Sequence, residues 1–88
     1  MTRQLRSLFS QLQLELDMTE SEEKDYLLLD HNNIYGGYIL MVVHPKQNYS
    51  QSFFLFSSRM SCKEMTALIQ GLISGLYWNK ETKKFNNH

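Results

Sequence analysis

Residues 60–76 read MSCKEMTALIQGLISGL, and this stretch carries both a helix start and an apolar stripe. Ser61 followed three residues later by Glu64 is a capping box, in which the serine hydroxyl accepts a hydrogen bond from the Glu64 amide and the carboxylate accepts one from the Ser61 amide. Methionines stand at the two positions of a hydrophobic staple around the box. The pattern predicts a helix that begins at Cys62.

Apolar side chains recur along this segment at helical spacing, which gives it one stripe for packing on a core. The stripe consists of Met65, Leu68, Ile69, Leu72, Ile73 and Leu76. Gly71 and Gly75 lie beside it, and a glycine in a helix interior costs about 1 kcal/mol relative to alanine. We therefore predict that the two glycines mark a close contact with an N-terminal helix, with Phe9 or Leu12 lying over them.

Two kinds of element precede this helix. A stripe at helical spacing predicts an amphipathic helix near the N-terminus, with Leu5, Leu8, Phe9, Leu12 and Leu16 on one face. Three short runs of aliphatic, β-branched or aromatic residues, at 26–29, 38–43 and 53–56, predict three strands. The connections between the runs are short, which predicts antiparallel pairing of neighbouring strands.

The predicted fold is α+β in the order α-β-β-β-α, a three-stranded antiparallel meander with two helices packed on one face. The chain has 88 residues, enough for one domain. We place that domain at residues 1–79 and expect residues 80–88 to form a frayed polar tail.

Both faces of the predicted sheet are apolar, because residues of either parity in 38–43 are apolar. Two helices cover one face, so the second face should be buried against a partner. We expect a homodimer, or a foreign protein on that face. The predicted protein-binding residues are Tyr38, Leu40, Val42, Phe53 and Leu55. Gly36 and Gly37 begin the second strand, where a glycine pair predicts a bulge or the close approach of another backbone or side chain.

Composition and spacing argue against several functions. Nine basic residues balance nine acidic ones, so the chain lacks the basic excess of a strong duplex-DNA binder. A single cysteine, Cys62, cannot form an intramolecular disulfide, which favours a reducing, cytoplasmic setting. His31, His44 and Cys62 are too scattered to predict a metal site. No catalytic site or cofactor is predicted, and the apolar runs are too short to cross a membrane.

Single-stranded nucleic acid is the alternative partner. Aromatic residues make up 12% of the chain, and aromatic side chains on a sheet can stack on bases. The cations that would contact phosphates are Lys46, Arg59, Lys80, Lys83 and Lys84. Because these cations are few, we favour an aromatic core and a protein interface over a platform for bases.

A resemblance covers residues 35–76, about half the chain. The residues that carry it are Tyr35-Gly36-Gly37-Tyr38, Arg59-Met60-Ser61, Lys63-Glu64-Met65, Leu68, Gly71-Leu72 and Gly75-Leu76. They resemble a diffuse group of small, uncharacterised accessory proteins of bacterial phages and other mobile genetic elements. The resemblance implies a binding role in the bacterial cytoplasm, as a replication accessory, host-takeover factor or defence antagonist, and it implies no catalytic residues.

Overall fold

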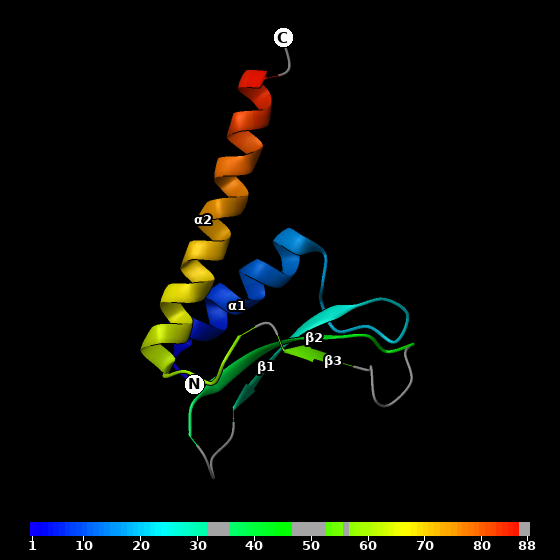
Figure 1. Ribbon diagram of the computed structural model, residues 1–88, viewed down its shortest axis with the longest axis vertical. Coiled ribbons are helices and arrows are strands. Elements are labelled where there is room, and N and C mark those ends of the chain that lie inside the picture. The colour runs from blue at the N-terminus through cyan, green and yellow to red at the C-terminus, as the bar shows by residue number, and fades with distance from the viewer. Residues whose placement is uncertain (32–35, 47–52, 56, 87–88) are drawn as a thin grey trace.

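The computed structural model describes residues 1–31, 36–46, 53–55 and 57–86. Its elements in chain order are helix α1 (Arg3–Leu16), strands β1 (Tyr26–His31), β2 (Tyr38–Val43) and β3 (Phe53–Leu55), and helix α2 (Cys62–Asn86). Figure 1 shows both helices on the same side of the sheet, with α2 continuing past α1 toward the C-terminus.

The sheet corrects the predicted three-stranded meander. β1 and β2 pair over six residues each, from Tyr26↔Val43 to His31↔Tyr38, and form an antiparallel two-stranded ribbon. β3 adds only three paired residues along the other side of β2. The prediction of a three-stranded meander is therefore wrong, although the broader α+β class agrees with the structure. Phe56, the expected end of the third strand, lies outside the described residues.

Just after β3, the side chain of Ser57 forms a hydrogen bond with the backbone of β2. The Leu40 amide donates to the Ser57 hydroxyl at 3.0 Å, and the Ser57 amide donates to the Leu40 carbonyl at 3.2 Å. With its amide bonded to a side chain, Leu40 no longer presents a complete backbone edge to a third strand. The chain can then turn toward α2 after a short edge strand.

The core lies between the two helices and one face of the ribbon. Strand residues that alternate with period two face it, as expected for a half-covered antiparallel sheet. The buried residues are Leu5, Leu12, Leu27, Leu29, Tyr38, Leu40, Met65, Ile69 and Ile73. The apolar stripes predicted for both helices therefore supply the side chains that bury this sheet face.

The glycine pair before β2 makes the predicted close approach. Gly36 and Gly37 have φ of 73° and 79°, which side chains rarely adopt. A Cβ on Gly37 would stand 2.8 Å from the Met60 carbonyl oxygen. That oxygen accepts the Tyr38 amide at 2.7 Å, and the Met60 amide donates back to the Tyr38 carbonyl at 2.9 Å. The bare backbone at Gly37 lets the segment before α2 attach to β2.

The capping box predicted at the start of α2 is confirmed. The Ser61 amide donates to Glu64 Oε1 and the Glu64 amide donates to the Ser61 hydroxyl, both at 3.1 Å. The helix begins at Cys62, as predicted. Helix α1 has a simple N-cap, in which the Thr2 hydroxyl accepts a hydrogen bond from the Leu5 amide at 3.1 Å.

The predicted frayed tail is wrong over residues 80–86, because α2 continues to Asn86. After Gly75 the sequence has no glycine or proline to interrupt a helix, and it contains good helix formers such as lysine and glutamate. Lys80 also donates to Glu15 of α1 at 2.8 Å, which ties the helix down beyond Trp78. The described chain measures 51 × 32 × 20 Å, and α2 forms its long dimension (Figure 1).

Candidate functional site

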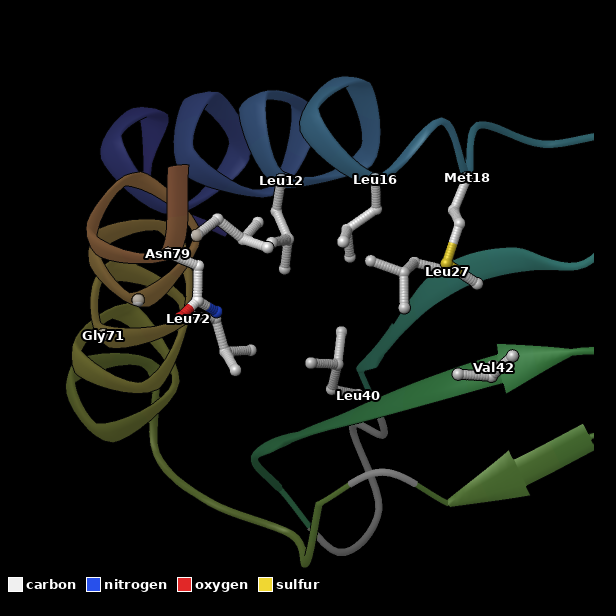
Figure 2. Close-up of a pocket in the computed structure, with 11 residues that line it drawn as sticks. Leu12, Leu16, Met18, Leu27, Leu40, Val42, Gly71, Leu72 and Asn79 are labelled. Carbon is white, nitrogen blue, oxygen red and sulfur yellow. The ribbon is translucent and has the colours of Figure 1, made fainter. Parts of the chain in front are cut away.

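An apolar groove opens between α1, α2 and the covered face of the ribbon, with a volume of about 390 Å³. Figure 2 shows side chains from both helices and both long strands pointing into one space. The lining residues are Leu12, Leu16, Met18, Leu27, Leu40, Val42, Gly71, Leu72, Gly75, Leu76 and Asn79. We call this feature the α1–α2 groove. Its size falls within the range of known ligand pockets, and Asn79 is the polar member of its lining.

The groove exists because two wall positions on α2 have no side chain. Nothing lies within 4 Å of the place where a Cβ would stand on Gly71 or on Gly75. The predicted close contact with Phe9 or Leu12 over these glycines is therefore wrong. The glycines leave an opening at the surface of α2, beside the leucines that line the groove.

Contacts at the end of α1 explain why the glycines stay uncovered. Glu15 accepts the Tyr77 hydroxyl at 3.3 Å and the Lys80 ammonium at 2.8 Å. Tyr77 and Lys80 lie about half a turn around α2 from Gly75 and Gly71 respectively, at 100° per residue. These contacts therefore hold the end of α1 on a different side of α2 from the glycines.

The same contacts form a small ionic cluster. The hydrogen bond and the positive charge of Lys80 lower the pKa of Glu15 from its ordinary value, and Glu15 raises the pKa of Lys80. The Lys80 ammonium also stands 5.7 Å from the centroid of the Tyr77 ring. The cluster fastens α1 to α2.

The predicted protein-binding residues divide between the two faces of the sheet. Tyr38 and Leu40 are buried under the helices, and Val42 lines the groove. The register pairs Leu55 with Met41 and Phe53 with Val43, which places those two residues on the opposite face. Grouping all five on one open face is therefore wrong. The sequence does not show the register, and a shift of one residue exchanges the faces of a strand.

The face of the ribbon away from the helices is apolar and partly open, in line with the expectation that both faces are apolar. Its residues in the two long strands include Tyr26, Leu28, Ile39, Met41 and Val43. Leu28 is 41% exposed, while the others are half-buried. This open sheet face is a second surface that a partner could cover.

Cys62 and the two described histidines lie in separate surroundings. The Thr2 hydroxyl, 3.8 Å from Cys62 Sγ, lowers the pKa of the thiol from its ordinary value. His31 stacks on Tyr38 with ring centroids 4.4 Å apart, and His44 Nδ1 lies 2.9 Å from the Asp25 carboxylate. Within the described residues, no group of three His, Cys, Asp or Glu side chains could hold a metal ion.

The cations predicted to contact nucleic acid are engaged by different parts of the chain. Lys46 pairs with Glu23 at 2.7 Å, Lys80 pairs with Glu15, and Arg59 donates to the Gly36 carbonyl at 3.2 Å. The backbones of Lys83 and Lys84 are helical, on the last turns of α2. The three described cation side chains thus come from separate elements, each beside an acid or a carbonyl.

Comparison with protein-family models, curated proteins and solved structures finds no match for this chain. None of the described helices is long and apolar enough to cross a membrane. Sequence reasoning missed the α1–α2 groove as a site, although the glycines four residues apart beside a leucine stripe were a visible sign that α2 has an uncovered flank.

Proposed function

We propose that this protein is a non-enzymatic binding protein that takes an apolar segment of another protein into the α1–α2 groove. The observation that carries the proposal is the open, almost wholly apolar lining of the groove. An amphipathic helix laying its apolar face into such a groove is a common mode of peptide recognition. Burial of leucine side chains from both partners would supply the driving force.

The chemistry of the lining supports binding in preference to catalysis. Among the described residues that line the groove, none is ionisable or nucleophilic. A general acid or base needs a titratable group within hydrogen-bond reach of the reacting atoms. The Glu15–Lys80 pair is close by in the fold, but its two charges neutralise each other.

The cellular setting is part of the proposal. A role as an accessory protein of a bacterial phage or other mobile element rests on the sequence resemblance, and a cytoplasmic location rests on the single cysteine. The proposed partners are a host or mobile-element protein and a second copy of this chain.

A matched pair of leucines on α1 tests the groove. Leu16 lines it and is 38% exposed, whereas Leu14 is 73% exposed and lies outside it. We expect tagged wild-type protein and Leu14→Gln to co-purify with the same protein partners from bacterial cells. Leu16→Gln should lose them, because an amide on the groove wall would be buried without a hydrogen-bond partner. Equal capture by all three proteins would contradict the proposal.

A salt series with labelled single-stranded oligonucleotide tests the alternative. Binding through phosphates weakens steeply as salt rises, because counterions are released on association. We expect no such binding. Tight, salt-sensitive binding that Lys46→Gln and Lys80→Gln weaken would support nucleic-acid binding instead.

A further inference from the structure

One face of α2 carries both a notch and a protruding aromatic ring. Gly71, Gly75 and Trp78 follow each other at spacings of four and three residues, so they lie on the same side of the helix. The space over both glycines is open to at least 4 Å from a Cβ position. Trp78, the sole tryptophan, is 71% exposed. The Trp78 ring therefore lies on the same side of α2 as the open space over the two glycines, and it does not fill that space.

The part of α2 that carries Trp78 is also short of neighbours. Figure 1 shows α2 extending past α1, with no other described helix or strand beside its C-terminal turns. Most helical stability in proteins comes from packing, so these turns would gain stability from a neighbour. The radius of gyration is 14.6 Å, against about 12 Å for a compact domain of this length. The shape of the chain leaves room for a partner along α2.

We propose that a second copy of this chain packs antiparallel along this face of α2, with each Trp78 seated over Gly71 of the other copy. Trp78 and Gly71 are seven residues apart, which is about 10 Å along a helix. A twofold axis midway between them places the ring of one copy on the notch of the other and makes both contacts at once. Such self-complementarity is what a twofold interface requires.

The pairing also supplies the neighbour that α2 lacks. In the antiparallel arrangement the projecting C-terminal turns of one α2 run beside the N-terminal half of the other. The glycines allow the ring to pack directly on backbone, and burying a tryptophan contributes more than burying most other side chains. The open sheet face is a weaker candidate for this contact, because its most exposed large apolar side chain, Leu28, is 41% exposed against 71% for Trp78.

Trp78 itself reports on the contact, since its fluorescence is the only tryptophan signal of the chain. We expect light scattering to show a dimer at high protein concentration, with blue-shifted emission that moves to the red as dilution separates the copies. A Cβ at Gly71 meets nothing within 4 Å, so Gly71→Leu places its branched side chain in the open notch. This variant should weaken dimerisation by roughly tenfold or more and give red-shifted emission throughout the dilution series.

Two further variants complete the experiment. Trp78→Ala should also give a monomer by light scattering, with helical circular dichroism retained. Leu14→Ala, at an equally exposed leucine on α1, should leave the dimer intact. A wild-type protein that stays monomeric at the highest concentration, or a dimer unaffected by both Gly71→Leu and Trp78→Ala, would overturn the inference.

The inference rests on the proposed function only in that both use protein binding along α2, and their failures are distinguishable. Gly71 also lines the groove, so the variant that separates the two proposals is Trp78→Ala, because Trp78 is not among the residues that line the groove. Loss of partner capture in Leu16→Gln concerns the groove, while loss of the dimer in Trp78→Ala concerns the exposed ring beside it. Capture that depends on Leu16 in a strictly monomeric protein would leave the proposed function standing and remove the second copy.

Discussion

The chain has two pairs of glycines, and the sequence suggests the same role for both, but their surroundings in the structure differ. Both Gly36-Gly37 and Gly71/Gly75 predict close packing, because glycine has a cost that a contact can offset. At Gly37 the contact exists, with the Met60 carbonyl oxygen 2.8 Å from the position of a Cβ. At Gly71 and Gly75 the space is empty to at least 4 Å.

Backbone conformation accounts for the difference. Gly36 and Gly37 have positive φ at the start of an antiparallel strand, a geometry that itself favours glycine. Gly71 and Gly75 lie within an α-helix, where every residue type except proline fits the backbone. A helical glycine is therefore explained by what lies against the helix surface. In the part of the chain that the structure describes, nothing lies within 4 Å of a Cβ at either glycine, which directs attention to a partner.

The largest expected effect is at Gly37. Gly37→Ala should destabilise the fold by about 3 kcal/mol, because positive φ strains the alanine and its Cβ would overlap the Met60 carbonyl. Gly36→Ala is the matched control, with φ of 73° and nothing within 4 Å. The control should cost only about 1 kcal/mol from backbone strain. Chemical denaturation of both variants measures the difference, and equal losses would show that the Met60 contact is unimportant.

Gly75 should give the opposite sign. In a protein that light scattering shows to be monomeric, Gly75→Ala should stabilise by about 1 kcal/mol, because alanine is the better helix former and its methyl group meets no neighbour. Denaturant midpoints at low protein concentration provide the measurement. A loss of stability under those conditions would mean that this face of α2 is packed within a single chain, as the sequence alone suggested.

Local signals in the sequence were sufficient to locate most of the helices and strands. The capping box located the first turn of α2, and the apolar periodicity identified the side chains that both helices bury. The short length of β3 could not be read in this way, because it depends on the Ser57 hydroxyl bonding to Leu40, seventeen residues earlier in the chain. Long-range side-chain bonds of this kind leave no periodic trace in a sequence.

The candidate site was less accessible to sequence reasoning than the fold. Whether Tyr38 or Ile39 faces the helices depends on strand register, which alternation cannot decide when both faces are apolar. The α1–α2 groove depends on which flank of α2 receives α1, and the Glu15 contacts to Tyr77 and Lys80 decide that. These side chains are polar and lie outside the apolar stripes, so hydrophobic patterning did not include them.

The smallest expected effect is at the helix cap beside the Gly37 contact. Ser61→Ala removes the acceptor of the Glu64 amide and should cost roughly 0.5 to 1 kcal/mol. Ser58→Ala is the control, at an exposed serine in the same segment. If the backbone bridge between Tyr38 and Met60 alone positions this segment, Ser61→Ala will change the denaturant midpoint no more than Ser58→Ala does.

Lowering the pH should distinguish the contribution of the Glu64 carboxylate to the same cap from that of the Ser61 hydroxyl. The Ser61 amide and hydroxyl hydrogen bonds lower the pKa of Glu64 below its ordinary value. A carboxyl group with a lowered pKa in the folded state contributes stability that is fully present above its unfolded pKa and is lost as pH falls through the folded value. Glu64→Gln should therefore be less stable than wild type at neutral pH and approach it in acid, while the Gly36→Ala deficit stays constant. If the stability difference between Glu64→Gln and wild type does not change with pH, the carboxylate charge does not contribute to the cap. The segment around Met60 would then be held by its backbone hydrogen bonds to Tyr38 alone.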